Sequence, residues 1–349
     1  MRKERVLLGM SGGTDSSVAA ILLKEAGYEV IGVTFRFYEK EETNTELLAA
    51  QQLAKELSIQ HITHDARPLF EEMIITDFIA EYMAGRTPVP CMKCNNLLKW
   101  PLLAKLADQE GIHYIASGHY VRKRLFENHY YLLPGADEEK DQSFFLWGLS
   151  SDLIARILLP LGDYTKPEIR AIAHARGFKA IATKKDSLGV CFCPMDYRTF
   201  LRNRLPAATF TQGRFYDEQG NVLGKHDGYP FYTIGQRRGL GLQLNKPLFV
   251  QAIDPTTNRI VLSSLKGLEQ CDMFLKEWHF IHLSDIDRED TIYVRVRYRK
   301  QENTCSLSLL SDGRMHVLFD QPITAIAPGQ SAAFYQNGRL IGGGIIATY

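Results

Sequence analysis

Gly9-Met10-Ser11-Gly12-Gly13-Thr14-Asp15-Ser16-Ser17 follows the apolar run Val6-Leu7-Leu8 and opens a segment whose apolar residues have helical spacing. This order predicts a buried strand, a tight turn and a helix. Gly12 and Gly13 permit positive φ, which brings backbone N–H groups close to an anion, and the hydroxyl side chains add donors where the helix begins. The stretch therefore predicts a phosphate loop. The alternative is a Gly-Ser turn that only caps a helix.

The loop contains no lysine, which separates it from the Gly-x-x-x-x-Gly-Lys-Ser/Thr loop of kinase-type NTPases. Its order Ser-Gly-Gly-Thr-Asp-Ser-Ser resembles instead the PP-loop of ATP pyrophosphatases. That resemblance implies a loop that holds the pyrophosphate part of ATP while the α-phosphate is attacked, and therefore an enzyme that makes adenylates. The ATP contacts that it implies in the loop are Gly9, Met10, Ser11, Gly12, Gly13, Thr14, Asp15 and Ser16.

Length and composition limit the possible classes of protein. The chain has 349 residues, of which 45% are apolar, enough for two or three domains. Its net charge of +1 does not by itself indicate a nucleic-acid partner. The sequence has no apolar run of membrane-spanning length and no signal-peptide pattern at its start, so we expect a cytoplasmic protein without a membrane partner.

The spacing of apolar residues divides the chain into three parts. Up to about residue 205, short apolar runs alternate with amphipathic helical stretches, which predicts a doubly wound α/β domain with a mainly parallel, Rossmann-like sheet. After residue 205 turn residues multiply and helical patterns vanish, which predicts a small β-rich domain. Alternating strands then predict a C-terminal β-barrel. We expect the domains at 1–205, 206–268 and 269–349.

Local signals add detail to this outline. Pro88 and Pro90 precede Cys91-x-x-Cys94, so we expect a loop there. Residues 140–146 should begin a helix, and Thr165-Lys166-Pro167-Glu168 is typical of a capping box. The alternation from Thr291 to Arg299 predicts a strand with one apolar face and one cationic face.

Four of the six cysteines fall in two groups, Cys91 with Cys94 and Cys191 with Cys193, which favours catalytic or metal-binding roles over a disulfide scaffold. Three interpretations stay open. Cys94 and Cys191 could be catalytic thiols that carry sulfur and close a disulfide. Cys91, Cys94 and Cys191 could hold an iron–sulfur cluster, with Cys193 as a possible fourth ligand. The four together could bind structural zinc.

Motifs from all three parts resemble those of the bacterial tRNA-specific 2-thiouridylase family, and they occur in the family's order over nearly the whole chain. They are Gly9 to Ser17, Gly85-Arg86-Thr87-Pro88-x-Pro90, Cys94-Asn95, Ser117-Gly118-His119-Tyr120, Lys140-Asp141-Gln142-Ser143, Lys185-Asp186-Ser187-x-Gly189-x-Cys191-Phe192 and Gly235-Gln236-Arg237-x-Gly239-Leu240-Gly241.

The resemblance implies a two-step reaction on wobble uridine 34 of tRNA. ATP, with Mg²⁺, adenylates the C2 oxygen, and sulfur then replaces it to give 2-thiouridine. A persulfide on Cys191, loaded by a sulfur donor or carrier protein, delivers the sulfur, and Cys94 is the second thiol. The tRNAs expected from the resemblance are those for Lys, Glu and Gln.

Further site residues follow from the same resemblance. Phe35 corresponds to a residue that packs on adenine, and Gly118 to a backbone contact with the nucleotide, a place that the end of a predicted strand also favours. The positions expected to contact tRNA are His119, Lys140, Asp141, Gln142, Arg297, Tyr298 and Gln330.

The chain departs from the family pattern at two cysteines. Where most members carry aspartate, within Asp-x-x-Cys, it has Cys91, and it adds Cys193. The set Cys91, Cys94 and Cys191 is similar to that of tRNA-thiolating relatives that bind a [4Fe-4S] cluster through three cysteines. A cluster route is therefore the alternative to the Cys191 persulfide.

Two rival functions remain on the sequence. Another PP-loop adenylating enzyme, such as an amidotransferase-type synthetase, would share the loop but need an ammonia source or an amino-acid pocket, and the cysteine pair argues against it. A tRNA-binding protein that uses ATP only as a conformational signal would bind tRNA without releasing pyrophosphate.

Overall fold

The computed structural model describes residues 3–38, 45–183, 189–193, 196–243, 246–287, 289–298, 301 and 303–348. The motif residues Lys185, Asp186 and Ser187, and the end of the expected strand at Arg299, lie outside the described residues. Among the helices of the described ranges, none is long and apolar enough to cross a membrane.

The N-terminal domain is built on a five-stranded parallel sheet of order β3-β2-β1-β4-β7, as the sequence predicted. The order reverses between β1 and β4, and ligands of open α/β sheets bind at such a reversal, outside the carboxyl ends of the strands. The strands are β1 (Arg5–Gly9), β2 (Glu29–Arg36), β3 (Gln60–Asp65), β4 (Tyr114–Ala116) and β7 (Ile157–Leu158).

Helices cover both faces of this sheet because side chains alternate along β1. Val6 and Leu8 pack with α1 (Thr14–Glu25), α2 (Thr45–Glu56) and α8 (Lys166–Ala175), whereas Leu7 packs on the opposite face with α6 (Trp100–Gln109). All three strand residues are fully buried. The other helices near this sheet are α7 (Ser151–Arg156) and α9 (Lys179–Ala182).

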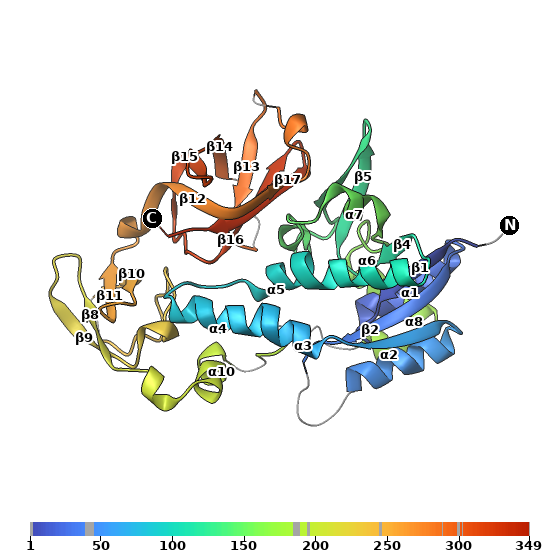
Figure 1. Ribbon diagram of the computed structural model, residues 1–349, viewed down its shortest axis with the longest axis horizontal. Coiled ribbons are helices and arrows are strands. Elements are labelled where there is room, and N and C mark those ends of the chain that lie inside the picture. Colours follow the sequence, from blue (N-terminus) through green and yellow to red (C-terminus); the bar gives the residue numbers. More distant parts are fainter. Residues whose placement is uncertain are drawn as a thin grey trace.

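Two long helical segments run from the sheet toward the rest of the molecule (Figure 1). One comprises α3 (Arg67–Phe70), the π-helical stretch η1 (Glu71–Ile75) and α4 (Thr76–Met83), and the other comprises α5 (Pro90–Lys93), the π-helical η2 (Cys94–Lys99) and α6. The prediction of a loop at Cys91-x-x-Cys94 is therefore wrong. Pro90 occupies the first turn of α5, where a missing N–H costs nothing, so this proline begins a helix and does not prevent one.

A hairpin of the N-terminal domain extends the sheet of the C-terminal domain. Its strands are β5 (Val121–Phe126) and β6 (His129–Pro134), and Leu132 of β6 is paired with Leu340 of β17. The helix expected to begin at residue 140 is only the 3-10 turn η3 (Ser143–Phe145), because Asp141 uses its carboxylate on the backbone N–H groups of Gly135 and Ser143. The two outer domains are thus joined by shared strand pairing.

A small four-stranded sheet of order β10-β11-β8-β9 follows, and α10 (Tyr197–Arg204) packs on it. Phe200 of α10 shares a buried cluster with Phe215 and Phe231, so a continuous core crosses the predicted boundary at residue 205, and the three domain ranges stay predictions. The elements are η4 (Ala207–Thr209), β8 (Gly213–Tyr216), β9 (Val222–His226), η5 (Tyr229–Phe231), β10 (Phe249–Asp254), β11 (Arg259–Ser263) and η6 (Lys266–Leu268).

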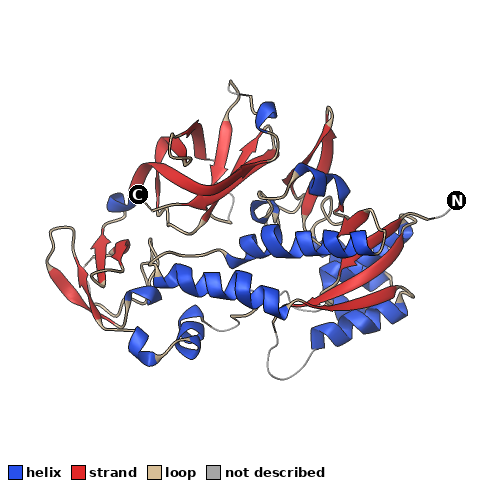
Figure 2. Ribbon diagram, in the orientation of Figure 1, coloured by secondary structure: helices blue, strands red, loops and turns tan. Residues whose placement is uncertain are grey.

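The C-terminal domain is a six-stranded antiparallel barrel, closed because β12 pairs with both β15 and β17. Figure 2 shows its strands beside the helix-rich N-terminal domain. Asn337 and Gly338 turn the β16–β17 hairpin with φ of 51° and 73°, as expected for this pair. The elements are β12 (Glu269–Phe280), η7 (Leu283–Asp285), β13 (Ile292–Arg295), β14 (Asn303–Leu309), β15 (Met315–Thr324), β16 (Ser331–Gln336) and β17 (Arg339–Ile346).

The strand expected over 291–299 is shorter than predicted. β13 ends at Arg295, and Arg295 is only 8% exposed, so the cationic side of this strand is not turned to solvent at this residue. The reason is that this side of the barrel lies against the N-terminal domain, where Arg295 meets Asp141.

Candidate active site

The phosphate loop connects the end of β1 to the first turn of α1. Gly12 has φ of +67°, as expected, but Gly13 has φ of −91° and is the extended N-cap residue of α1, so the prediction of positive φ there is wrong. Ser16 Oγ accepts a hydrogen bond from the Ser11 N–H (3.2 Å), and Ser17 Oγ donates to the Gly13 carbonyl (2.7 Å). These bonds fix the loop around the N-terminus of a helix, which attracts anions.

Gly118 closes the other side of the loop. A Cβ added at Gly118 would lie 2.7 Å from the carbonyl carbon of Asp15 and 2.9 Å from the nitrogen of Ser16, too close for any side chain. The chain after β4 therefore rests directly on the first turn of α1. The carboxyl ends of β1 and β4, between which the strand order reverses, therefore lie at one continuous edge of the sheet.

Asp15 of the loop has two partners from distant parts of the sequence. Lys166 Nζ donates to both carboxylate oxygens (2.7 and 2.9 Å), and the Tyr120 hydroxyl donates to Oδ1 (2.6 Å). Lys166 is 6% exposed. The sequence interpretation treated Lys166 only as part of a capping box, which the structure contains. The overlooked signal is that a phosphate loop without its own lysine needs a cation from elsewhere in the chain.

Phe35 lies near the end of β2, next to the loop. Its ring stacks on Phe37 at 5.4 Å and meets His64 edge-on at 5.9 Å. Phe35 packs against the core under the sheet and also against the aromatic cluster that contains Cys94. The position expected to contact adenine therefore adjoins the surroundings of the cysteines.

Cys91 and Cys94 lie in the first turns of the segment that begins at Pro90. The Asn95 side chain donates to the Cys91 carbonyl (2.9 Å) and holds this start of the helix. Cys94 is 8% exposed, and Cys91 is partly exposed. Placed on a helix, the two thiols have a fixed spacing that a loop would not give them.

Cys191 lies on the short segment 189–193, which is anchored by its neighbour Phe192. The Phe192 ring is 1% exposed and meets Phe70 and Phe78 edge-on at 5.6 and 5.1 Å. Cys191 itself is an exposed residue. The buried anchor holds this exposed residue near the helix that carries Cys94.

The thiols influence one another electrostatically. The protein packed around the Cys191 sulfur, and after it the neighbouring Cys91 and Cys94, raise the pKa of the Cys191 thiol to about 11. Burial also raises the pKa of Cys91 and of Cys94. In all three cases Lys99 acts in the opposite direction, so its ammonium group is a cation shared by the three sulfurs. Sequence analysis did not assign Lys99 a role.

His119 connects the thiols to the phosphate loop. Burial, and next the nearby Lys99, lower the pKa of His119 to about 3, so this imidazole is neutral. Its Nδ1 lies 2.6 Å from Ser117 Oγ. His119 follows Gly118, which rests on Asp15, and Lys99 acts electrostatically both on His119 and on the three thiols.

The four cysteines do not form a zinc site in this geometry. Tetrahedral zinc thiolates have Zn–S bonds of about 2.3 Å, which brings the sulfurs within about 4 Å of one another. Among the described residues, ligand atoms of three or more His, Cys, Asp or Glu side chains lie within 4.8 Å of one another at His129, His282 and Asp285. This group contains no cysteine. An iron–sulfur cluster, in which iron and sulfide separate the thiolates, does not require the cysteine sulfurs to lie this close together.

Asp141, which was expected to contact tRNA, forms its hydrogen bonds with other residues of the protein. It is 5% exposed, and its carboxylate accepts hydrogen bonds from the N–H groups of Gly135 (3.1 Å) and Ser143 (3.0 Å), from Ser143 Oγ (3.0 Å) and from Arg295 Nη1 (2.7 Å). Arg295 also lies over the Tyr335 ring at 4.3 Å. The geometry of Asp141 is that of a buried ion pair between the N-terminal domain and the barrel.

Gln142 and Lys140 flank this ion pair. The Gln142 side-chain oxygen accepts a hydrogen bond from the Tyr120 N–H (3.0 Å), which links it to the partner of Asp15. Lys140 is partly exposed. The structure therefore brings Gln142 to the loop side of the segment, next to His119.

Two of the barrel residues expected to contact tRNA, Tyr298 and Gln330, lie on its border with the N-terminal domain. Tyr298 is 39% exposed, and its ring stacks on Phe145 at 5.0 Å. Arg297 is exposed and donates to the carbonyls of residues 324 and 325 (both 3.1 Å). Gln330 donates to the Thr87 carbonyl (2.9 Å), just before the cysteine helix. Tyr298 and Arg297 keep surface for an external ligand, whereas Gln330 fastens the barrel to residue 87.

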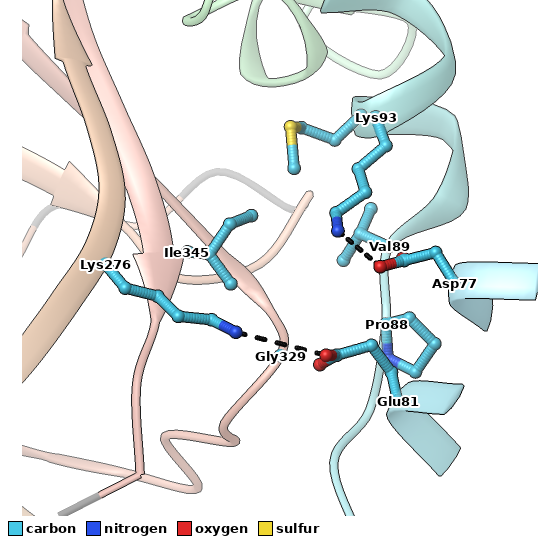
Figure 3. A pocket seen from close by; sticks show the side chains of 9 residues that line it. Asp77, Glu81, Pro88, Val89, Lys93, Lys276, Gly329 and Ile345 are labelled. Atoms are coloured by element: carbon cyan, nitrogen blue, oxygen red, sulfur yellow. Dashed lines mark hydrogen bonds and ion pairs between the residues drawn. The ribbon is translucent and has the colours of Figure 1, made fainter. Parts of the chain in front are cut away.

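A small cavity behind the cysteine helix is lined by charges that neutralise one another. Figure 3 shows Lys93 directed at Asp77 (2.5 Å) and Lys276 of the barrel directed at Glu81 (3.9 Å). Burial acts to raise the pKa of Glu81, but the hydrogen bonds and charge of Arg86, together with the charges of Lys276 and Lys93, outweigh it and lower the pKa overall. Ion pairs around the cavity therefore connect α4 with the cysteine helix on one side and with the barrel on the other.

Comparisons with known proteins cover nearly the whole chain. The sequence matches the tRNA methyl transferase HUP domain over residues 4–195, the tRNA methyl transferase PRC-barrel domain over 198–264 and the aminomethyltransferase beta-barrel domain over 271–346. It is 56% identical to a tRNA-specific 2-thiouridylase MnmA 1 of Bacteroides fragilis over 99% of this chain and 98% of the relative. It is 42% identical to a tRNA-specific 2-thiouridylase MnmA of Amoebophilus asiaticus, over 99% and 96%.

Among solved structures, the chain is similar to the U34-tRNA thiolase NcsA from Methanococcus maripaludis with its [4Fe-4S] cluster. The match covers 58% of this chain and 64% of that chain, with a TM-score of 0.37 and 18% sequence identity. A likeness this low carries no inference about the site.

Proposed function

Because this chain belongs to the tRNA-specific 2-thiouridylase (MnmA) family, it is a tRNA sulfurtransferase, and we propose that it adenylates the C2 oxygen of wobble uridine 34 with ATP and replaces that oxygen by sulfur. One observation carries the proposal. Gly118 rests on Asp15 of the phosphate loop, and Lys99 lies in range of both His119 and the three thiols. An adenylating loop and a sulfur-carrying set thus adjoin each other.

In the first step the C2 oxygen attacks the α-phosphorus of ATP, and pyrophosphate leaves. Asp15 and Lys166 form an ion pair at the loop, and we infer that ATP separates them, so that Lys166 binds the phosphates. Mg²⁺ held by Asp15 would offset the negative charge of the phosphates. The loop N–H groups and Lys166 stabilise the charge that develops on the leaving pyrophosphate. Phe35 offers a ring face for adenine at the end of β2.

In the second step a Cys191 persulfide attacks C2 through its terminal sulfur, and AMP leaves with the former C2 oxygen. The Cys94 thiolate then attacks Cys191 Sγ, the bond from that atom to the transferred sulfur breaks, and a Cys94–Cys191 disulfide forms as 2-thiouridine is released. A dithiol reductant restores both thiols, and a persulfide donor or carrier protein reloads Cys191. Lys99 favours each anionic sulfur, whereas the high pKa of the resting Cys191 thiol keeps it protonated at neutral pH.

A second route for the sulfur step rests on Cys91. Cys91, Cys94 and Cys191 act on one another's titration, and three thiolates are the ligand set of a [4Fe-4S] cluster with one iron open. In that route a cluster would supply sulfide at its open iron. Cys91 would then be essential, whereas the persulfide route does not need it.

We propose that tRNA binds across the border between the barrel and the N-terminal domain. Arg297 and Lys140 would contact its backbone, Gln330 would act by holding the barrel at residue 87, and the exposed face of Tyr298 would stack on a base near the extruded uridine. His119 and Gln142 would line the pocket for the uridine, with His119 as a neutral hydrogen-bonding group. Asp141 would act indirectly, by holding Arg295 and therefore the barrel in place. The expected substrates are the tRNAs for Lys, Glu and Gln.

The test of this function is thiolation of unmodified tRNA for Lys with ATP, Mg²⁺ and a persulfide donor, with pyrophosphate measured in parallel. We expect both 2-thiouridine and tRNA-dependent pyrophosphate release. Pyrophosphate release without thiolation would favour the synthetase class, and tRNA binding without pyrophosphate release would favour a binding protein.

Iron and acid-labile sulfide, measured on protein purified without oxygen, distinguish the two sulfur routes. In the persulfide route the protein holds no stoichiometric iron, and Cys91→Asp keeps thiolation. In the cluster route wild-type protein holds iron and sulfide, and Cys91→Asp loses both together with thiolation.

A further inference from the structure

A group of three potential metal ligands lies away from the phosphate loop and the cysteines. His129 belongs to β6 of the N-terminal hairpin, whereas His282 and Asp285 belong to the segment that follows β12 of the barrel. One ligand atom from each of the three lies within 4.8 Å of the others. The group therefore bridges two domains at the place where the hairpin joins the barrel sheet.

Asp285 supplies an ionised carboxylate to this group. Its Oδ2 accepts a hydrogen bond from the Tyr131 hydroxyl (2.5 Å) and lies 2.6 Å from His129 Nδ1, and its Oδ1 accepts one from Ser284 Oγ (2.9 Å). Tyr131 thus fixes the orientation of an anionic oxygen ligand.

His282 supplies an imidazole nitrogen without a partner. Its Nε2 is buried and has no hydrogen-bond partner in the described structure, a state that costs free energy unless a ligand occupies the nitrogen. A neutral imidazole with a free lone pair is the form that binds metals.

We propose that His129, His282 and Asp285 bind a divalent transition metal ion of the zinc class, with Tyr131 as the residue that orients Asp285. Two imidazoles and one carboxylate suit Zn²⁺, whereas Mg²⁺ and Ca²⁺ prefer oxygen ligands throughout. Water would complete the coordination.

The resting geometry requires one movement for binding. The His129 and His282 rings are stacked 3.8 Å apart and inclined by only 9°, so their in-plane lone pairs do not converge on one ion. One ring has to turn about its Cβ–Cγ bond. His129 has the room for this, because its side chain is 42% exposed. The bound ion would then tie the hairpin to the barrel, in addition to the pairing of β6 with β17.

The test uses Zn²⁺ and Co²⁺ with the full-length chain in which Cys91, Cys94, Cys191 and Cys193 are changed to Ser, so that these thiols cannot bind the metal. Isothermal titration measures Zn²⁺ affinity and stoichiometry, and the Co²⁺ spectrum reports the ligands, because thiolate ligation adds a strong charge-transfer band. We expect one ion per chain, Co²⁺ bands without that charge-transfer absorption, and a higher unfolding temperature with Zn²⁺.

Two variants and one matched control complete the test. His282→Gln should abolish binding, and Tyr131→Phe should weaken it by roughly 10- to 100-fold, the usual effect of removing a group that orients a ligand. The control is His316→Gln, because His316 forms a similar pair with Asp272 in the same barrel (2.9 Å) but belongs to no such three-ligand group in the described residues.

No Zn²⁺ binding in the background with those four cysteines replaced would overturn the proposal, as would binding that survives His282→Gln or is lost in His316→Gln. Circular dichroism shows whether each variant is folded, and the graded effect of Tyr131→Phe tests the site even if His282→Gln is unstable.

Discussion

The buried pair of Asp141 and Arg295 allows a sharp test of whether a residue expected to contact tRNA holds the domains together. In Asp141→Asn the amide oxygen can keep the bonds from the Gly135 and Ser143 N–H groups. The amide NH₂ then faces two donors, the Ser143 hydroxyl and the Arg295 guanidinium, which lie 3.0 and 2.7 Å from the carboxylate oxygen in the wild type. Arg295 loses the charge that balances its own.

The magnitude follows from the burial of the pair. The two side chains are 5% and 10% exposed, so water cannot replace the lost partner. Breaking a buried ion pair by removing one partner costs about 3 to 5 kcal/mol. At 2 to 4 °C per kcal/mol for a domain of moderate size, the unfolding midpoint should fall by roughly 6 to 20 °C.

Thermal unfolding followed by circular dichroism, with tRNA affinity measured well below the midpoint, is the assay. The control is Arg124→Gln, which breaks an exposed pair with Asp163 (49% and 57% exposed) and should cost less than about 1 kcal/mol. The reasoning would be refuted if Asp141→Asn unfolded no earlier than the control while its tRNA affinity dropped, because Asp141 would then act on tRNA directly.

Three further predictions concern the active site. Lys166→Met should lower tRNA-dependent pyrophosphate release by roughly 10²- to 10³-fold, since it removes a cation from the leaving phosphates. Gly118→Ala should raise the KM for ATP, measured by the same release, because its Cβ would lie 2.7 Å from the Asp15 carbonyl carbon. Alkylation of Cys191 should accelerate about tenfold per pH unit below its pKa of about 11, as the thiolate fraction rises. Lys99→Met should slow that alkylation, because losing the cation raises the thiol pKa.

Each of these three has its own control or contrary outcome. Lys179→Met changes an exposed lysine and should leave pyrophosphate release intact, and an equal loss there would remove the argument from Lys166. Gly111→Ala strains a left-handed residue without any atom within 4 Å of its Cβ, so its KM for ATP should match the wild type. An alkylation rate that Lys99→Met leaves unchanged would show that Lys99 is not the shared cation.

Elements that depend on residues close together in the sequence could be predicted from it. The apolar run Val6-Leu7-Leu8 predicted a buried strand, and these residues do enter cores on opposite sides of the sheet. The Thr165–Glu168 capping box and the Asn337-Gly338 turn are present for the same reason, because the interactions that form them span only a few residues.

Features that depend on distant contacts could not be predicted in the same way. The pairing of Leu132 with Leu340 leaves no trace in either segment, and it explains why the hairpin belongs to the barrel sheet. Arg295 alternates like a solvent-facing residue, yet another domain covers it. Pro90 permits both a loop and a helix start, and the packing of the following segment selected the helix.

For the site itself, sequence motifs identified the loop and the cysteines but missed the cations around them. Lys166 and Lys99 lie within helical patterns, and only the fold directs their charges toward Asp15 and toward the thiols. A general rule follows for loops of this kind. Where a phosphate loop has no lysine, the cation should be sought in the helices whose first turns face the loop.

The most direct test of the central claim compares Cys191→Ser with Cys193→Ser in the thiolation of unmodified tRNA for Lys, with pyrophosphate measured in the same reactions. Cys191→Ser should release pyrophosphate and form no 2-thiouridine, because adenylation needs the loop and not the thiol. Cys193→Ser should release pyrophosphate and also form 2-thiouridine. Formation of 2-thiouridine by Cys191→Ser would contradict the account, because sulfur would then reach the adenylated uridine without the thiol assigned to both routes.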